Sequence, residues 1–319
     1  MLATGLLMSV VAGRAQEAGD WLVRMDHALS SLSYRGVLVS VGPGRFESYK
    51  VVHRVDDGVI RERLIALDGP EREVLRENDR VQCLISGQHT LVLSNPWPVR
   101  LLARVPLSRA LTAGSVYRAS VGGTGRVAGR DARLIEIQPQ DRFRYGRRLW
   151  LDEDTGMLLR AVVFDPAGEV VEQLSFVAIE IGVAIADAEL DSELTEPAAI
   201  ARYTLPEMAE KTVLGPAPEG LRELLPPGFE LASVGRGDRN NPFEHLLFSD
   251  GLSSFSIYIE PGTQSSLNEY LESRGAMHIY TGRLDDRVVT VLGEVPAQTV
   301  RMVGHRILRE RYPAFRHLE

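Results

Sequence analysis

The spacing of apolar residues divides this chain into a short helical segment and a long strand-forming one. From residue 17 to residue 32 the apolar side chains recur at helical intervals and share one face, namely Trp21, Leu22, Met25, Leu29 and Leu32. The apolar residues then alternate with a period of two, beginning at Val37, Val39 and Val41. The pattern predicts one amphipathic helix followed by a series of β-strands.

Turn-forming residues then recur about every 8–12 positions, which is typical of an antiparallel meander. We predict strands at 37–41, 45–55, 59–67, 71–77, 80–86, 89–94, 115–121, 126–137, 147–152, 157–165 and 169–181, with a short helical connector at 106–111. About ten strands are many for one flat sheet, so such a sheet tends to curl into a barrel or half-barrel with a helix on its open side. For residues 16–186 we therefore expect a large half-open antiparallel β-barrel domain with covering helices.

The remainder of the chain predicts a linker and a second domain. Residues 187–220 begin acidic and are then interrupted by four prolines, which indicates a linker with some ordered pieces. Residues 221–319 predict strands at 229–234, 245–248, 255–260, 277–283 and 287–295, and helices at 265–274 and 297–308. Gly275 would end the first of these helices and Pro296 would begin the second. The fold class is therefore β-rich α+β, in which the half-barrel is followed by a small antiparallel sheet with helices.

The first residues have the pattern of an export signal. The apolar run from Leu2 to Gly13 is too short to span a bilayer. Small residues at Gly13 and Ala15, followed by polar Gln16, suit signal-peptidase cleavage after Ala15. We expect residues 1–15 to be the remnant of a signal peptide, and a buried N-terminal helix is the alternative.

Composition and motifs exclude several kinds of chemistry. The chain of 319 residues has a formal net charge of −7, which argues against a broad nucleic-acid interface. Its histidines are scattered, and the single cysteine, Cys83, occupies an alternating strand position typical of a small core residue. The segment 123–128 fits GxGxxA but precedes a predicted strand instead of a helix. The run 152–163 resembles a calcium loop without its last carboxylate, which favours a β-turn. We predict no catalytic residue, no metal and no cofactor.

One cluster of charge indicates a binding surface. Between Asp141 and Arg148 the chain carries four arginines and two aromatic residues at the junction of a loop and a strand. Guanidinium groups suit phosphates and carboxylates, and aromatic rings can support them by stacking. The predicted partner or anionic-lipid contacts are Arg142, Arg144, Tyr145, Arg147 and Arg148. The alternative is a solvated strand face with local acidic partners. A second predicted surface, on the small domain, consists of Ser249, Asp250, Ser254 and Tyr258.

Short motifs along both predicted domains resemble those of the RseB/MucB family. In the first domain they are Tyr34-Arg35-Gly36, Glu62-Arg63-Leu64, residues 67–74, 126–130, 141–146, 149–152 and Thr155-Gly156. In the second they are Pro227-Gly228-Phe229, residues 248–252, Val289-Thr290-Val291 and residues 293–296. These motifs occur in order over nearly the whole chain, which makes the resemblance specific.

The resemblance implies a periplasmic negative regulator of envelope-stress signalling of the sigma-E or AlgU type. Such a protein binds the periplasmic domain of an RseA/MucA-type anti-sigma factor, shields it from regulated proteolysis, and is released by lipopolysaccharide or another acyl lipid. The resemblance also implies a large domain like the lipoprotein carriers LolA and LolB, no enzymatic activity, and self-association as a homodimer. Two alternatives remain at this stage: a periplasmic lipid or lipoprotein carrier of the LolA/LolB type, and an unrecognised envelope enzyme.

Overall fold

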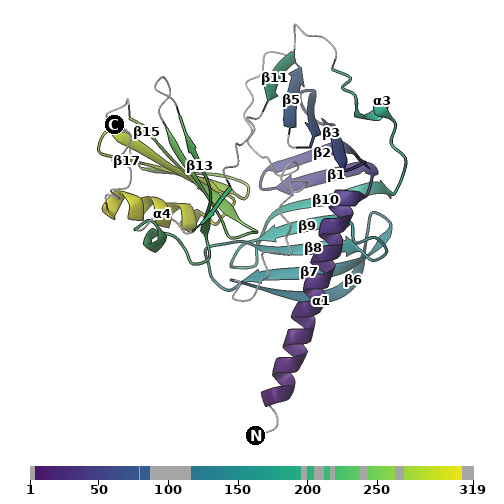
Figure 1. Ribbon diagram of the computed structural model, residues 1–319, viewed down its shortest axis with the longest axis horizontal. Coiled ribbons are helices and arrows are strands. Elements are labelled where there is room, and N and C mark those ends of the chain that lie inside the picture. The colour runs from purple at the N-terminus through teal and green to yellow at the C-terminus, as the bar shows by residue number, and fades with distance from the viewer. Residues whose placement is uncertain are drawn as a thin grey trace.

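The computed structural model describes residues 4–78, 80–86, 116–194, 200–204, 212–215, 220–237, 243–262 and 269–310. Within these residues the chain forms two antiparallel sheets that lie side by side, each with a helix against one face (Figure 1). The predicted strand at 89–94 and the predicted connector at 106–111 lie outside the described residues.

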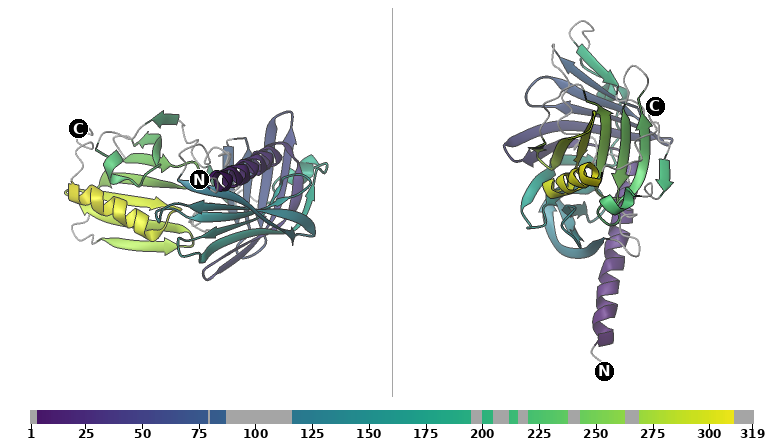
Figure 2. Two further views of the ribbon diagram at one scale, coloured as in Figure 1. Left: turned by 90° about the horizontal axis from the view of Figure 1, so that it is seen from below. Right: turned by 90° about the vertical axis from the view of Figure 1, so that its left-hand side faces the viewer.

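The first helix, α1 (Thr4–Ser31), packs across the concave face of the large sheet (Figures 1 and 2). Its buried side chains are Ala18, Leu22, Met25 and Ala28, and Trp21 and Leu29 pack half-buried against the same core. The helical periodicity predicted for 17–32 is therefore confirmed, although the helix begins earlier, at Thr4. The first turns of α1 extend beyond the sheet (Figure 1). Among the described residues, no helix is long and apolar enough to cross a membrane.

The large sheet has eleven described strands in the order β11-β5-β4-β3-β2-β1-β10-β9-β8-β7-β6. Their bounds are β1 (Tyr34–Gly42), β2 (Arg45–Asp56), β3 (Val59–Ala66), β4 (Arg72–Glu77), β5 (Arg80–Ser86), β6 (Tyr117–Val127), β7 (Arg130–Pro139), β8 (Gly146–Asp152), β9 (Leu158–Phe164), β10 (Val170–Ile181) and β11 (Ile200–Thr204). Because β11 and β6 are not paired with each other, the sheet is curled but not closed. The half-open architecture predicted from the sequence is confirmed.

One turn of the large sheet lies elsewhere than predicted. The predicted strand at 126–137 contains the turn that joins β6 to β7 at Ala128 and Gly129, whose φ values are 50° and 79°. Two successive positive φ angles form the primed turn that matches the twist of a hairpin. The glycines before this turn obscured its position, because they remain within β6, where the register shifts between Val121 and Thr124. The GxGxxA match therefore lies in a strand and its turn.

Cys83 and the predicted β-turn after Asp152 agree with the sequence analysis. Cys83 is buried, with 1% of its surface exposed, and burial raises the pKa of its thiol. The Asp152 carboxylate accepts hydrogen bonds from Arg130 (Nε, 2.6 Å) and Thr155 (Oγ1, 2.7 Å). Asp152 is thus part of a turn, as predicted.

The segment predicted as a linker adds one strand to each sheet. After the short helix α3 (Asp187–Leu190), β11 pairs antiparallel with β5 of the large sheet. Strand β12 (Thr212–Gly215) then pairs with β13 of the small sheet. The backbone of this segment is therefore hydrogen-bonded to the large sheet through β11 and to the small sheet through β12.

The small sheet has seven described strands in the order β12-β13-β14-β15-β18-β17-β16. Their remaining bounds are β13 (Glu230–Arg236), β14 (Glu244–Ser249), β15 (Ser254–Pro261), β16 (Tyr270–Arg274), β17 (Met277–Leu284) and β18 (Arg287–Gly293), with a 3-10 turn η2 (Arg222–Leu224) and helix α4 (Ala297–Glu310). Helix α4 buries Val300, Val303 and Ile307 against one face of the sheet, which confirms the last predicted helix and its apolar face.

The helix predicted at 265–274 is wrong for its second half. Tyr270–Arg274 is strand β16, which pairs with β17 across a tight turn at Gly275 and Ala276. Gly275 has a φ of 60°, a conformation that ends a helix and also turns a hairpin. A glycine at this position therefore does not distinguish the two structures, and pairing with β17 decided between them. Residues 263–268 lie outside the described residues.

Two helical glycines give opposite expectations for the same substitution. A Cβ on Gly304 in α4 would lie 2.1 Å from the buried Tyr280 ring, whereas a Cβ on Gly19 in α1 would meet nothing within 4 Å. We expect Gly304→Ala to lower the free energy of unfolding by about 1–3 kcal/mol because it overpacks the core. We expect Gly19→Ala to raise it by up to about 1 kcal/mol through helix propensity. Urea denaturation of both variants measures this; stabilisation by Gly304→Ala would contradict the packing of α4.

Candidate functional site

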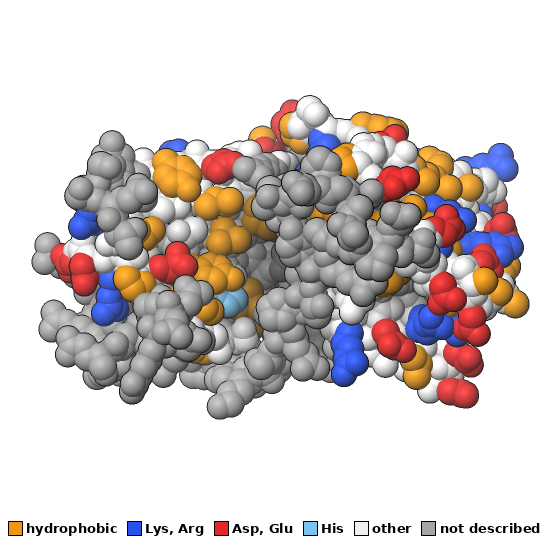
Figure 3. Space-filling model, turned by 90° about the horizontal axis from the view of Figure 1, so that it is seen from above, with side chains coloured by type: hydrophobic (Ala, Val, Ile, Leu, Met, Phe, Trp, Pro, Cys, Tyr) orange, Lys and Arg blue, Asp and Glu red, His pale blue; other side chains and the backbone are white. Residues whose placement is uncertain are grey.

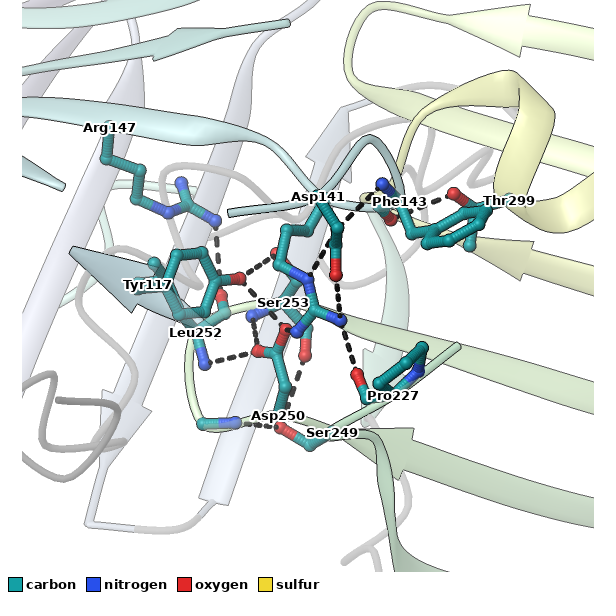
Figure 4. Close-up of polar contacts among 12 residues, drawn as sticks. Tyr117, Asp141, Phe143, Arg147, Pro227, Ser249, Asp250, Leu252, Ser253 and Thr299 are labelled. Atoms are coloured by element: carbon teal, nitrogen blue, oxygen red, sulfur yellow. Dashed lines mark hydrogen bonds and ion pairs between the residues drawn. The ribbon is translucent and has the colours of Figure 1, made fainter. Parts of the chain in front are cut away.

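The two domains meet at the loop between β7 and β8, residues 140–145, which contacts three separate pieces of the small domain. These pieces are the segment before β13, the turn between β14 and β15, and the first turn of α4 (Figure 4). We call this contact the joint. It is built from residues that are far apart in the sequence, and its centre is an ion pair between the two domains.

The guanidinium of Arg144 lies at the centre of the joint and is completely buried. It donates to Asp250 Oδ2 at 2.5 Å across the joint and to Asp141 of its own loop at 3.0–3.1 Å. A third bond goes to the backbone carbonyl of Pro227. The group also stacks over the rings of Phe229, at 4.8 Å, and Tyr117, at 5.5 Å. A buried cation needs such complete pairing, because an unpaired one is costly to desolvate.

The carboxylate of Asp250 is buried as fully as its partner. Besides Arg144, its Oδ2 accepts the Tyr117 hydroxyl at 2.9 Å. Its Oδ1 accepts the backbone N–H groups of Leu252, at 2.9 Å, and Ser253, at 2.7 Å. Backbone N–H groups of its own turn therefore donate to Oδ1, whereas side chains of the large domain donate to Oδ2. This division fixes the turn between β14 and β15 against the large domain.

Further hydrogen bonds surround the ion pair. Thr299 Oγ1 and Gln298 Nε2, in the first turn of α4, donate to the carbonyls of Phe143, at 2.8 Å, and Arg142, at 2.5 Å. Arg147 Nη2 donates to the carbonyl of Leu252 at 3.2 Å. The orientation of α4 is therefore tied to the same loop that carries Arg144.

Apolar contacts cross the joint beside its polar centre. Ala276, in the turn between β16 and β17, is buried in the core cluster of the large domain, and Leu252 packs half-buried against that cluster. Two turns of the small domain therefore pack against the large domain's core. An interface of this kind, with a packed core and paired charges, restrains the relative motion of two domains.

Burial shifts the pKa values of the titratable groups at the joint. It raises the pKa of Tyr117 and the pKa of Tyr145 well above their ordinary value, so both phenols stay protonated. The Tyr145 hydroxyl lies 3.2 Å from His278 Nδ1, which is also 3.0 Å from the carbonyl of Val295. Desolvation lowers the pKa of His278, and its hydrogen bonds to backbone carbonyls offset this in part.

The residues predicted for partner or anionic-lipid contacts do not form one exposed patch. Arg144, Tyr145 and Arg147 are buried at the joint. Arg148 pairs with Glu136 at 2.9 Å and lies over the ring of Phe164. Arg142 is the most exposed of the four arginines, and the side chain of Arg148 is 36% exposed. The structure thus brings much of this cluster to the joint, while the binding role predicted for these residues stays a prediction.

The four residues predicted on the small-domain surface also separate. Asp250 is the centre of the joint, and Ser249 accepts the Gly251 N–H at 3.1 Å within the same turn. Ser254 and Tyr258 are half-buried on β15, where Tyr258 stacks on His245 with ring centroids 4.2 Å apart. Arg144 and Asp250 were both predicted as contact residues, but their pairing was not predicted. The signal in the sequence that could have indicated this pairing was the opposite charge of Arg144, in the motif Asp-Arg-Phe-Arg, and Asp250, in the motif Ser-Asp-Gly.

Both domains match known families. Residues 17–194 match the MucB/RseB N-terminal domain, and residues 221–308 match the MucB/RseB C-terminal domain. The chain belongs to the MucB/RseB family. The resemblance drawn from the short sequence motifs is thereby confirmed.

Relatives in the MucB/RseB family align with almost the entire chain. The sigma factor AlgU regulatory protein MucB of Pseudomonas aeruginosa is 35% identical over 97% of this chain and 96% of the relative. The sigma-E factor regulatory protein RseB of Salmonella typhimurium is 28% identical over 96% of this chain and 95% of the relative. These relatives are regulatory proteins by name.

Solved structures of MucB share the fold of both domains. In the complex of Pseudomonas aeruginosa MucA and MucB, the matching chain has a TM-score of 0.69 and 32% identity, covering 90% of this chain and 97% of that one. A crystal structure of MucB alone matches with a TM-score of 0.65 and 31% identity, covering 91% of this chain and 97% of that one.

Removing one partner of the buried ion pair should destabilise the joint strongly. We expect Arg144→Ala to lower the free energy of unfolding by about 3–5 kcal/mol, because it leaves the Asp250 carboxylate buried without its cation. Urea denaturation measures the change. Arg142→Ala, two positions away and exposed, is the matched control and should change stability by less than about 0.5 kcal/mol.

The pairing itself is tested by removing both charges. In the double variant Arg144→Met with Asp250→Asn, neither charge remains buried alone, so its loss of stability should be smaller than the sum of the two single losses. Strictly additive losses would contradict a direct interaction between the two side chains.

The protonation of His278 should make the joint sensitive to acid. Because burial holds the pKa of His278 below its ordinary value of 6.5, the unfolded chain takes up a proton there before the folded chain does. The stability that this group contributes is therefore present above about pH 6.5 and is lost as the pH falls below it. We expect His278→Gln to reduce the fall of the urea midpoint between pH 7.5 and pH 5.5. His27→Gln, at an exposed position of α1, is the control and should leave this fall unchanged. Full wild-type pH dependence in His278→Gln would contradict the expectation.

Proposed function

We propose that this chain is a periplasmic negative regulator of envelope-stress signalling that binds the periplasmic domain of a MucA/RseA-type anti-sigma factor. The observation that carries the proposal is the match of both domains to MucB in a crystal structure with MucA(peri), with a TM-score of 0.68 over 90% of this chain and 97% of that one. The relatives named as AlgU and sigma-E regulators support the same function.

The geometry is suited to binding a polypeptide without chemical change. Among the strands that the structure describes, β11 and β6 form the edges of the large sheet, and β12 and β16 form those of the small sheet. An extended peptide can add to such an edge as a further strand, with side-chain pockets giving specificity. The buried joint fixes the two sheets relative to each other before a partner arrives, which reduces the ordering that binding requires.

The surface offers both apolar and charged contacts. Apolar side chains gather on the small domain, while acidic and basic side chains are mixed at the far end of the large domain (Figure 3). Of the predicted contacts, exposed Arg142 and half-buried Arg148, Ser254 and Tyr258 are candidates that the joint leaves accessible. We assign Arg142 to an acidic group of the partner and Tyr258 to an apolar one.

Release by a lipid completes the proposed function. Lipopolysaccharide or another acyl lipid would favour a conformation of the large domain that holds the anti-sigma segment less tightly. A coupling free energy of about 1–3 kcal/mol would weaken the partner's affinity roughly 5- to 150-fold. The bound segment would then be open to regulated proteolysis. Neither ligand needs a catalytic group, and the proposal includes homodimer formation as a further state of the same protein.

Calorimetric titration tests partner, ligand and coupling together. We expect the purified chain to bind the periplasmic domain of a MucA/RseA-type anti-sigma factor, and purified lipopolysaccharide to weaken that binding within the range above. Arg142→Ala should weaken partner binding without changing stability, whereas Arg126→Ala, another exposed arginine, should leave it unchanged.

Two results would overturn the proposal. Failure of the wild-type chain to bind any MucA/RseA-type periplasmic domain, while acyl lipids do bind, would favour a lipid or lipoprotein carrier instead. Unchanged partner affinity across a full titration with lipopolysaccharide would refute the release mechanism while leaving partner binding intact.

A further inference from the structure

The outer face of the large sheet, opposite α1, presents four arginines on three adjacent strands. Arg35 lies on β1, Arg54 on β2, and Arg61 and Arg63 on β3. Arg54 and Arg61 are direct cross-strand partners, a position in which like charges repel each other. We call these four residues the basic face. The positive charges of these four arginines need acidic groups from other parts of the chain to neutralise them.

One such group is Glu180 of β10, which pairs with Arg35 at 2.8 Å, and most of the others come from the beginning of the linker. Residues 183–193, here called the acidic strap, run over the basic face. They contribute four carboxylates within seven residues of chain, namely those of Asp187, Glu189, Asp191 and Glu193. Asp187 Oδ1 lies 2.8 Å from Arg54 and 3.1 Å from Arg61, so a single carboxylate bridges the two opposed arginines.

The other carboxylates of the strap continue the pattern. Glu189 pairs with Arg35 at 3.2 Å, Asp191 with Arg61 at 3.4 Å, and Glu193 with Arg63 at 3.3 Å. Arg63 is the most buried of the four arginines, with 2% of its side chain exposed, and it also binds Glu73 at 2.7 Å. Hydrogen bonds from Arg54 and Arg61 lower the pKa of the Asp187 carboxyl, as expected for a carboxylate held between two cations.

The strap has little apolar anchoring. Ile185 and Leu190 pack on Val52 in a small cluster separate from the two main cores, with Val183 beside it. The outer carboxylates of Asp187, Asp191 and Glu193 are mostly exposed, at 73%, 68% and 82%. Ion pairs so exposed to water are individually weak and are screened by salt. The strap is therefore held mainly by many weak electrostatic contacts and one small apolar contact.

We propose that the acidic strap is a detachable latch, an internal ligand of the basic face that ionic strength releases as a unit. The partner that this surface fits is an acidic peptide with a leucine between its carboxylates, and the chain supplies that peptide from its own linker. Release frees residues 183–193, so the latch governs how firmly the beginning of the linker is held to the large domain. The strap lies at the end of the large domain away from the small domain (Figure 1). This inference does not depend on the proposed function.

Hydrogen exchange of the full chain, followed by mass spectrometry, tests the latch. Three amides of the strap are hydrogen-bonded within it: Glu189 N–H to the Ala186 carbonyl, Asp191 N–H to the Asp187 carbonyl, and Ala186 N–H to Glu189 Oε1. We expect their exchange to accelerate about tenfold between roughly 0.05 M and 1 M sodium chloride, because the Debye length falls from over 10 Å to about 3 Å. Amides of β15, in the small-domain core, provide the internal reference and should not change.

A charge reversal provides a second and independent measurement. Asp187→Arg places a third cation between Arg54 and Arg61 and should give fast exchange of the strap already at low salt. Asp286→Arg, in an exposed hairpin turn, makes the same change of net charge and should leave the strap protected. Strap amides that exchange equally slowly at both salt concentrations in the wild-type chain would overturn the proposal, whether or not Asp187→Arg folds. Strap exchange that rises only together with β15 exchange would also overturn it, since that marks global unfolding.

Discussion

A guanidinium and a carboxylate, both closed off from water, hold the two sheets of this protein in a single arrangement. Each side chain is completely buried, and a buried charge without a partner costs several kcal/mol in lost hydration, so Arg144 and Asp250 depend on each other. Each is therefore surrounded by further donors or acceptors, and these come from both domains. The ion pair thus specifies which loop must face which turn. Apolar contacts alone, such as those of Leu252 and Ala276, would permit more than one docking angle.

This constraint also prepares the two sheets for the partner binding proposed above. A partner that contacts both sheets finds them already oriented, so less of its binding free energy is spent on ordering the domains. The same rigidity makes the joint a natural place for control. A ligand that shifts the loop between β7 and β8 would move α4 and the turn between β14 and β15 together, because all three share hydrogen bonds.

Much of the fold was predictable because local patterns agree with tertiary contacts. The face of α1, the meander of strands and the last helix follow from periodicity and turn residues alone. The wrong predictions lie at glycines that suit more than one structure. Gly275 is compatible with the end of a helix and with a hairpin turn. The several glycines between 122 and 129 do not indicate which of these residues form the turn between β6 and β7. The joint was not predictable, because a pair such as Arg144 and Asp250, 106 residues apart, leaves no periodic trace in one sequence. An isolated arginine cluster is interpreted most simply as a surface, whereas the structure buries two of its four arginines, Arg144 and Arg147, at the joint.

The division of the linker between two sheets has a mechanical consequence. Strand β11 ends at Thr204 on the large sheet and β12 begins at Thr212 on the small one. The eight Cα-to-Cα steps from Thr204 to Thr212 span at most roughly 28 Å even when the chain is fully extended, which limits the distance between the ends of the two strands. If the domains moved so that Thr204 and Thr212 had to lie further apart than this span, β11 would have to lose its pairing with β5, or β12 its pairing with β13. The separation of the large and small sheets is therefore limited for as long as both β11 and β12 stay paired.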